Sequence, residues 1–363
     1  MMAEALEQNP KKRSGWKTAL LILLILLLLG AMAAGGVGYY VYRSLLPMEA
    51  GEPVEVSIPS GTGSAAIAKL LEEQGIIKNG LIFSAYLKVK HEGDRFQAGN
   101  YQLAPGMTLA EITDKLNRGD VIKEEMIRFT IPEGYTVLQI AEKLAADGIV
   151  NKDSFLALAN DSGKWTYPWI TSIPSNAQLR YRLEGYLFPE TYEMKKESTE
   201  QAILERMLAE WDKKQKSLPQ GWEAQMDKLG LDLHGILTVA SLVEREVAVD
   251  EERPLVAGVI YNRLKQKMPL QIDATVQYLF DKQKERLFEK DLQTQSPYNT
   301  YLNPGLPPGP IASPGLLSIK AALFPEETKY LFYVTKKDGS GGHLFAETFE
   351  EHKKNNAASK LEK

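Results

Sequence analysis

Two glutamates near the end of a predicted helix are the residues of this sequence best suited to acid–base chemistry. Apolar residues recur at helical spacing over 236–247, and Glu244 and Glu246 interrupt that apolar stripe. Side chains two positions apart leave a helix in directions roughly 160–200° apart. One face of the helix can therefore hold only one of the two carboxylates.

The neighbours along the helix favour Glu246 as the reactive group. A helical Glu246 lies over Leu242 and Val243, whereas the neighbours of Glu244 include a serine and an alanine. Apolar surroundings disfavour the ionised carboxylate and raise its pKa, which suits a general acid near neutral pH. The alternative is that both glutamates are solvated charges on the helix surface, paired with nearby arginines.

Composition narrows the chemistry that this chain can perform. Its 363 residues are enough for about two domains. The net charge is −4 with both signs interspersed, so we expect no nucleic-acid partner. The sequence has no cysteine, which excludes disulfides and thiol catalysis, and its four histidines lack metal-ligand spacing. We therefore expect neither a metal nor a cofactor.

The N-terminal part of the chain predicts a membrane anchor. No charge occurs from Ala19 to Val41, a run long enough to cross an apolar layer of about 30 Å. Basic residues precede this run, which predicts a cytoplasmic tail at 1–15, a single transmembrane helix at 16–42 and an extracytoplasmic body. The alternative is a cleaved signal peptide, because residues 31–33 read Ala-Met-Ala.

An internal repeat follows a short linker at 43–52. The motif IPSG at 58–61 returns as IPEG at 131–134, and two further matches keep the same offset of 73 residues. Each copy predicts a strand, a turn, a helix, a glycine stop and a second helix. In the first copy residues 101–103 add a closing strand, which gives a β-α-α-β module. This module either grips a polysaccharide or positions the catalytic part, or it is only a structural spacer.

Several loops offer polar groups to a ligand. The segment 183–192 places Glu184 among aromatic residues, a combination that is typical of sugar-binding clefts. The alternative is a loop that packs in the hydrophobic core, which would have the same composition. Residues 270–273 alternate like a short strand with Gln271 and Asp273 on one face, while a helix N-cap is the alternative role of Asp273.

A proline-rich loop and a hairpin complete the predicted site. Residues 297–315 contain too many prolines and glycines for helix or strand, so this loop is suited to lining a site with Tyr298, Asn299 and Thr300. Strands at 331–335 and 343–346 follow, and His343 is expected to be a hairpin residue rather than a catalytic base.

Six motifs, in this order along the chain, resemble the YceG-like endolytic murein transglycosylase family. They are LEGYLFPETY at 183–192, VASLVEREV at 239–247, ERPLVAGVIYNRL at 252–264, LQIDATVQY at 270–278, SPYNTYLNPGLPPGPIASPG at 296–315 and GGHLFAETFEEH at 341–352. The resemblance implies an α+β fold with a membrane helix, a LysM-like β-α-α-β module at 53–126, a mainly helical catalytic domain at 127–352 and a polar tail at 353–363.

The resemblance also implies the chemistry. The family's catalytic glutamate corresponds to Glu246, and the family cleaves the β-1,4 bond between N-acetylmuramic acid and N-acetylglucosamine inside glycan strands, leaving 1,6-anhydro ends. One carboxyl group suffices, because it can protonate the leaving oxygen and then accept the proton of the attacking muramyl 6-hydroxyl. The residues expected to bind substrate are Glu184, Asn262, Gln271, Asp273, Tyr298, Asn299 and Thr300.

The partners that the resemblance implies are peptidoglycan strands, penicillin-binding proteins and elongation or division proteins. Two other functions stay open at this point. One is a muramidase-type hydrolase, in which Asp273 or Glu184 supplies the second carboxylate that hydrolases use. The other is a non-catalytic peptidoglycan-binding anchor that depends on the module at 53–126.

Overall fold

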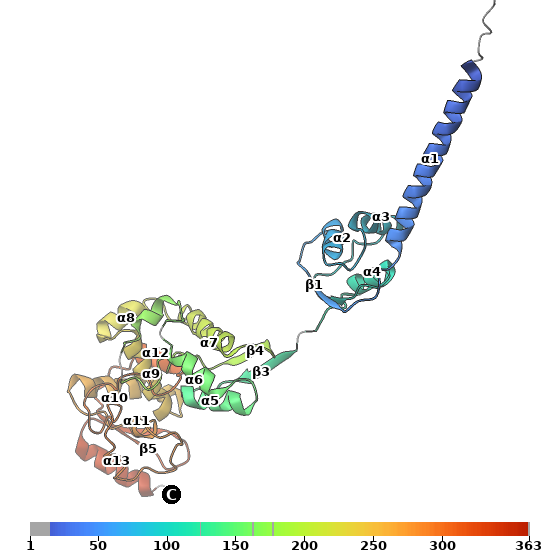
Figure 1. The fold of residues 1–363 in the computed structure, drawn as a ribbon. Coiled ribbons are helices and arrows are strands. Elements are labelled where there is room, and N and C mark those ends of the chain that lie inside the picture. Colours follow the sequence, from blue (N-terminus) through green and yellow to red (C-terminus); the bar gives the residue numbers. More distant parts are fainter. Residues whose placement is uncertain (1–14, 124, 162, 176–177, 362–363) are drawn as a thin grey trace, which may run out of the picture. The chain divides into compact units, whose positions relative to one another are not determined.

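A computed structural model describes residues 15–123, 125–161, 163–175 and 178–361. The chain divides into two compact units, residues 1–124 and 125–363 (Figure 1). Each unit has its own hydrophobic core.

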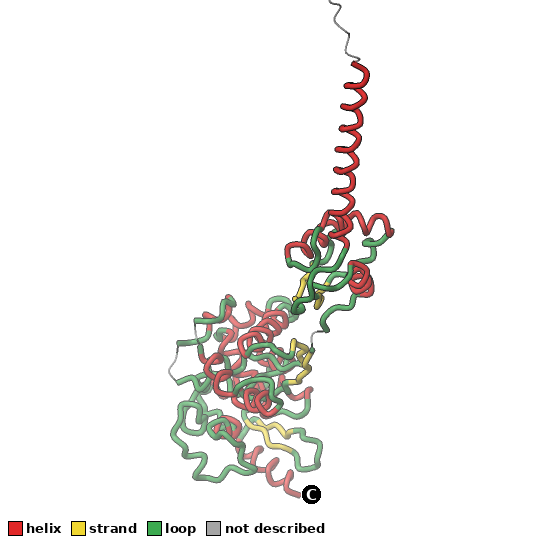
Figure 2. The backbone as a smooth tube through the Cα atoms, turned by 45° about the vertical axis from the view of Figure 1, so that its right-hand side comes forward, coloured by secondary structure: helices red, strands yellow, loops and turns green. Residues whose placement is uncertain are grey.

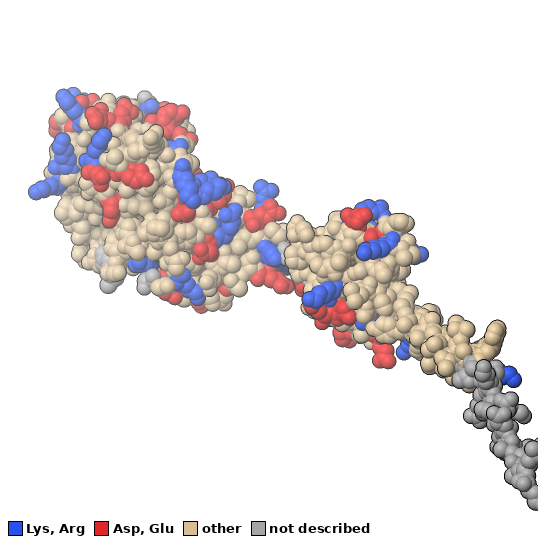
Figure 3. Space-filling model, turned by 90° about the horizontal axis from the view of Figure 1, so that it is seen from above, with Lys and Arg blue, Asp and Glu red and all other residues tan. Residues whose placement is uncertain are grey.

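The first described element is the apolar helix α1 (Gly15–Leu45). Its stretch Ala19–Leu45 is long and apolar enough to cross a membrane, and its apolar side chains are exposed. Figure 3 shows α1 nearly free of charged residues, whereas charges of both signs are interspersed on the drawn faces of both units. The helix therefore has the length and surface of a membrane span.

The rest of unit 1 is a small module around one two-stranded sheet. Its elements are β1 (Val54–Ile58), α2 (Ser64–Glu73), α3 (Gly80–Lys90), β2 (Gly99–Leu103) and α4 (Leu109–Arg118). Strands β1 and β2 pair antiparallel with Val56 opposite Tyr101, and the helices bury their apolar faces against them. The β-α-α-β order agrees with the sequence prediction, and α4 starts at the capping box that Thr108 forms with Glu111.

The second repeat has the same order, with a long insertion before its last strand. Its elements are β3 (Met126–Thr130), α5 (Val137–Ala146), α6 (Lys152–Asn160) and β4 (Thr191–Lys195). Strands β3 and β4 pair antiparallel, with Phe129 opposite Tyr192. The insertion contains the 3₁₀ helix η1 (Pro168–Ser172). The sequence did not predict β4 as the closing strand, because the insertion removes it from the 73-residue offset.

The remaining elements form a mainly helical body, as Figure 2 shows. They are α7 (Glu200–Gln215), α8 (Trp222–Leu229), α9 (Leu233–Glu246), η2 (Asp250–Glu252), α10 (Arg253–Lys265), α11 (Asp273–Gln277), α12 (Leu316–Leu323), β5 (Phe332–Thr335), β6 (His343–Ala346) and α13 (Phe349–Leu361). Helix α9 packs against α10, α11 and α12 and is buried over most of its length. Each sheet in the described residues has two antiparallel strands, so the mixed, mainly helical class expected from sequence is confirmed.

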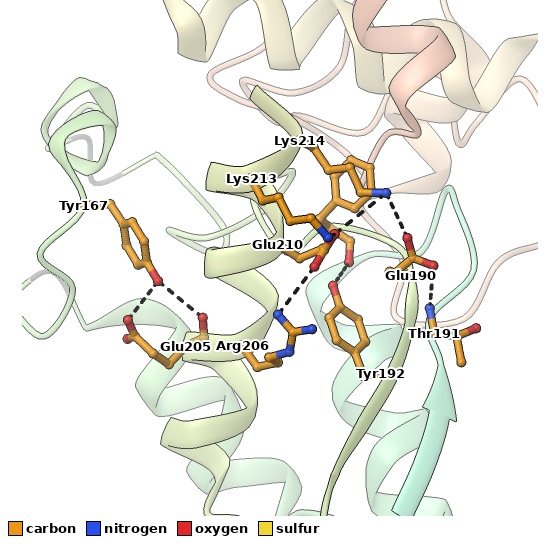
Figure 4. Close-up of polar contacts among 10 residues, drawn as sticks. Tyr167, Glu190, Thr191, Tyr192, Glu205, Arg206, Glu210, Lys213 and Lys214 are labelled. Atoms are coloured by element: carbon orange, nitrogen blue, oxygen red, sulfur yellow. Dashed lines mark hydrogen bonds and ion pairs between the residues drawn. The ribbon is translucent and has the colours of Figure 1, made fainter. Parts of the chain in front are cut away.

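Polar contacts hold β4 against the helical body (Figure 4). Glu210 of α7 is only 3% exposed and pairs with Arg206, Lys213 and Lys214 at 3.4, 3.4 and 3.8 Å. Lys214 also pairs at 2.9 Å with Glu190, directly before β4. A buried carboxylate needs such partners because removing its charge from water is costly. These residues are therefore part of the scaffold.

The segment 270–273 is not the short strand that alternation predicted. The backbone N–H of Gln271 donates to the carbonyl of Thr300, and that of Ile272 donates to the Thr300 hydroxyl, so no partner strand is present. Gln271 has φ of 52°, which breaks the alternation. Asp273 is the first residue of α11, and the N-cap is Ile272, without a side-chain cap, so the capping alternative is also wrong.

Candidate active site

Helix α9 carries both candidate glutamates in its last turn. The side chain of Asp232 caps its start by accepting from the N–H of Gly235 at 2.8 Å. The helix ends at Glu246, because the next residue adopts an extended backbone. A carboxylate at this end meets the negative end of the helix dipole, which disfavours ionisation.

Glu246 lies in surroundings that favour its protonated form over its ionised form. Its Oε2 accepts a hydrogen bond of 2.8 Å from the Tyr333 hydroxyl, and no described donor contacts its Oε1. Burial raises the pKa of Glu246 above its ordinary value, and the hydrogen bond from Tyr333 counteracts part of that rise. The charge of Asp273 raises this pKa further, whereas that of Arg245 lowers it. Glu246 is thus suited to donate a proton from Oε1.

The hairpin of β5 and β6 positions Tyr333. The ring of His343 meets the Tyr333 ring edge-on, with centroids 5.3 Å apart. Glu252 fixes His343 through a contact of 2.6 Å to Nδ1, and its other oxygen accepts from the His343 backbone N–H at 2.9 Å. His343 lies in the hairpin, as predicted, and it packs against Tyr333, the residue that hydrogen-bonds to Glu246. Burial raises the pKa of Tyr333 well above its ordinary value, so it stays a hydrogen-bond donor.

A second carboxylate belongs to the same cluster. Tyr301, in the proline-rich loop, donates to Oδ1 of Asp273 at 2.5 Å, and Asp273 is exposed. The pKa of Tyr301 is raised first by burial, then by its bond to Asp273 and by the charges of Asp273 and Glu246. Hydrogen bonds and electrostatic interactions therefore link Glu246, Asp273, Tyr301 and Tyr333 into one cluster, of which the sequence predicted only the two acidic residues.

The contacts of Glu244 indicate a role in holding the fold together. Its Oε2 accepts from the backbone N–H of Gly315 at 2.9 Å and from Arg253 Nη1 at 3.3 Å. The side chains of Glu244 and Arg253 are 7% and 9% exposed, and Arg253 also contacts the Ser318 hydroxyl at 2.5 Å. Glu244 thus joins α9 to α10 and to the start of α12. The alternative that both glutamates are solvated surface charges is wrong.

Glu184 lies in the core. It is 1% exposed, and it accepts from the backbone N–H of Val137 at 3.0 Å and from the Tyr278 hydroxyl at 2.9 Å. Burial raises the pKa of Glu184 to about 8, although these hydrogen bonds lower it. The aromatic loop 183–188 packs in the same core. The structure therefore places Glu184 where it joins α5 to α11, as the core-packing alternative expects.

The side-chain amides of Asn262 and Asn299, which were predicted to bind substrate, instead hydrogen-bond to backbone carbonyls of loops. The side-chain nitrogen of Asn262 donates at 2.9 Å to the carbonyls of Thr328 and Tyr330. That of Asn299 donates to backbone carbonyls in the loop 292–294, and Asn299 is fully buried. Both amides thus stabilise the backbone around the site.

The other two residues predicted from the proline-rich loop are also buried. The Thr300 hydroxyl accepts from the backbone N–H of Ile272 at 3.0 Å and contacts the hydroxyl of Thr275 at 2.9 Å. Tyr298 is 3% exposed and packs against Tyr278 with ring centroids 5.0 Å apart. These contacts fix the loop against α11.

Of the residues predicted to bind substrate, the structure leaves Gln271 and Asp273 exposed. The sequence reasoning missed Tyr301 and Tyr333, which hydrogen-bond to Asp273 and Glu246. A tyrosine in a short strand of a hairpin is usually expected to pack against its neighbours. No local sequence pattern indicates that its hydroxyl bonds to a glutamate far away in the chain. In the described ranges, no group of three acidic, histidine or cysteine side chains is placed to hold a metal ion.

The chain belongs to the YceG-like family, which matches residues 56–358. It is 38% identical to the endolytic murein transglycosylase of Bacillus subtilis (strain 168), over 88% of this chain and 89% of that protein. It is also 38% identical to the protein of that name from Streptococcus pneumoniae serotype 2, over 90% of this chain and 63% of the relative. A crystal structure of a putative yceG-like protein from Listeria monocytogenes matches with a TM-score of 0.56 and 34% identity, covering 84% of this chain and 99% of that one.

Proposed function

We propose that this chain is an endolytic murein transglycosylase that cleaves the MurNAc-β-1,4-GlcNAc bond inside glycan strands. The family membership and the names of its relatives support the reaction class. The observation that carries the proposal is Glu246, a carboxyl group whose pKa is raised by burial and which Tyr333 holds through Oε2. Such a group can serve as acid and then as base.

The reaction begins with proton transfer. Protonated Glu246 donates its proton to the glycosidic oxygen, and the bond from that oxygen to C1 of the muramyl unit breaks. The hydrogen bond from Tyr333 to Oε2 leaves Oε1 facing the substrate and stabilises the carboxylate that forms.

Ring closure completes the reaction without a second protein carboxylate. The muramyl 6-hydroxyl attacks C1 of its own sugar, and the Glu246 carboxylate takes the hydroxyl proton, which restores the starting acid. Because the nucleophile belongs to the same sugar, its positioning replaces the activation of a water molecule. The rigid proline-rich loop helps to keep water from C1.

The exposed carboxylate of Asp273 supports a second candidate, a muramidase-type hydrolase. Asp273 lies close enough to Glu246 to raise its pKa, and it could activate water in place of the 6-hydroxyl. Asp273 accepts a hydrogen bond from Tyr301, which would hold its carboxyl group beside the developing positive charge on the sugar. The two reactions differ in their products.

We assign α1 as an uncleaved single-pass anchor in the cytoplasmic membrane, with residues 1–15 cytoplasmic and the body outside. This position places the site near newly made strands, where the enzyme would terminate elongation. Penicillin-binding proteins and elongation or division proteins are proposed partners. The mass of the mature chain tests the anchor, since signal-peptide cleavage would remove the residues before about 34.

Product analysis tests the reaction. We expect full-length protein in detergent to convert polymerised glycan into fragments with anhydro ends, and Glu246→Gln to lower the rate by about 10²–10⁴-fold, the usual contribution of acid–base catalysis. The matched control is Glu193→Gln, at an exposed position in β4. Ends that have gained water would mean a hydrolase, and equal rates with and without Glu246 would contradict its catalytic role.

A further inference from the structure

A narrow crevice lies beside the end of α9, next to the proposed active site. Its lining includes Thr136, Gln139, Arg180, Arg245 and Ala274. Arg245 directly precedes Glu246 in α9, and Ala274 directly follows Asp273 in α11. Two residues that line the crevice are therefore the immediate chain neighbours of Glu246 and Asp273, although neither of these carboxyl groups lines it.

Arg245 provides the net positive charge of this crevice. Arg180 also lines it, but Arg180 pairs with Asp281 and donates to the carbonyl of Tyr278. Arg245 donates through Nη1 to the carbonyl of Gly134 at 3.2 Å, and no carboxylate among the described residues forms an ion pair with it. A guanidinium has five N–H donors, so most of those of Arg245 are open to a ligand.

The polar neighbours do not satisfy this charge. Gln139 uses its side-chain oxygen to accept from the backbone N–H of Thr136 in the capping box of α5. Glu184 accepts a hydrogen bond from the backbone N–H of Val137, the first residue of α5, so this N–H is not free to bind a ligand. A partly buried arginine without a counter-ion is costly unless an anion binds it. Arg245 is therefore the residue of the crevice best suited to hold an anionic ligand.

We propose that this crevice binds a carboxylate of the peptide attached to a muramyl unit beside the cleaved bond. This inference rests on the proposed function, because it concerns how the same substrate is held. In peptidoglycan the sugars are neutral, and the free carboxylates belong to the acidic stem peptide joined through the lactyl group. A carboxylate is small and flat, which suits a narrow crevice and a forked guanidinium.

The site would make the enzyme selective for strands that carry peptides. The test compares peptide-bearing strands with strands from which an amidase has removed the peptides, using full-length protein. We expect wild type to favour peptide-bearing strands, and Arg245→Gln to lower that preference about ten-fold, as for the loss of one charge-assisted contact. Arg245→Lys should retain part of it, and Arg128→Gln, at an exposed position in β3, should retain all of it.

The ratio of the two rates separates this proposal from other roles of Arg245. Loss of Arg245 also raises the pKa of Glu246 and frees the Gly134 carbonyl, but those effects act equally on both substrates. An equal loss on both substrates, or an unchanged preference, would overturn the peptide site. Failure of wild type to cleave either substrate would instead count against the proposed function.

A binding measurement tests the site without turnover. In the Glu246→Gln protein, N-acetylmuramyl-L-alanyl-D-glutamate should bind more tightly than the analogue in which both carboxylates are amides. Adding Arg245→Gln should remove this difference. Equal affinity for the acid and the amide would overturn the proposal, whatever the outcome for catalysis.

Discussion

The carboxyl group of Glu246 is subject to opposing influences at the residue scale. Burial and the charge of Asp273 raise its pKa, whereas the Tyr333 hydroxyl lowers it. A general acid needs its proton before the reaction and must release it during the reaction. The hydrogen bond from Tyr333 is stronger to the carboxylate than to the protonated acid, so it helps Glu246 to release its proton.

Tyr333→Phe tests this role. Without the hydroxyl the pKa of Glu246 should rise, so the basic limb of the pH profile of kcat/KM should move to higher pH. The rate at the optimum should fall about five-fold, the effect of losing a hydrogen bond worth about 1 kcal/mol. Tyr261→Phe is the matched control, because the Tyr261 hydroxyl donates to the Ala322 carbonyl at 2.8 Å, away from Glu246. A limb that stays in place or moves to lower pH would contradict the assignment.

Glu184 makes a second prediction, which concerns stability. Its folded pKa of about 8 lies above the ordinary value of 4.5, so the folded state binds one more proton than the unfolded chain between these values. The free energy of unfolding should therefore fall as pH rises from about 4.5 to about 8, by about 1.4 kcal/mol per unit of pKa difference at most.

Thermal unfolding between pH 5 and pH 8 measures the effect of Glu184. Glu184→Gln keeps an oxygen for the Val137 N–H and should flatten the decline in stability with pH. Glu193→Gln, at an exposed position, should leave the decline unchanged. A decline of the same slope in Glu184→Gln would mean that other groups cause it.

At the scale of elements, the loop between α10 and α11 holds Gln271 in the left-handed region. A side chain there costs roughly 1 kcal/mol or more, and such strain persists where surrounding contacts impose it. The exposed amide of Gln271 lies two residues before Asp273, so it is suited to contact the N-acetyl groups or hydroxyls of the substrate.

Gln271→Gly separates the backbone from the side chain. Glycine adopts this φ without strain, so the melting temperature should stay equal or rise. If the amide contacts substrate, KM should increase about five- to ten-fold, as for one lost hydrogen bond. A lower melting temperature together with an unchanged KM would indicate that the side chain only supports the fold.

The elements show which features the sequence could predict. Local signals such as the apolar spacing over 236–247 and the proline-rich composition of 297–315 predicted α9 and the loop before α12 close to their observed bounds. The short strand at 270–273 was wrong because a tertiary contact with Thr300 fixes that backbone. The partners of Glu246 come from positions distant in sequence, and no local pattern records such contacts.

The same limit applies to the polar residues of the predicted site. Asn262, Asn299 and Thr300 are of types that bind sugars, but they are also the types that hold irregular loops through backbone hydrogen bonds. The structure uses them in the second way. Residue type and loop position therefore do not show which of these side chains are free to contact a ligand.

At the scale of the whole molecule, the residues assigned to catalysis all belong to residues 125–363. Unit 1 has a separate core formed by its own strands and helices, and unit 2 has the core that surrounds α9. Two cores in one chain predict two cooperative folding units. The β-α-α-β module of unit 1 is thus an addition whose contribution can be measured separately.

Removal of unit 1 tests the proposal that its module grips glycan. Residues 125–363 should fold and cleave short soluble glycan fragments at nearly the rate of the full chain, because Glu246, Tyr333 and Asp273 remain together. On long strands KM should rise by about ten-fold or more, since a second binding module raises the effective concentration of substrate at the site. Equal KM values on long strands would make the module a spacer. If the module is a spacer, residues 46–123 alone should not bind glycan. If residues 125–363 fail to cleave short fragments, part of the active site belongs to unit 1.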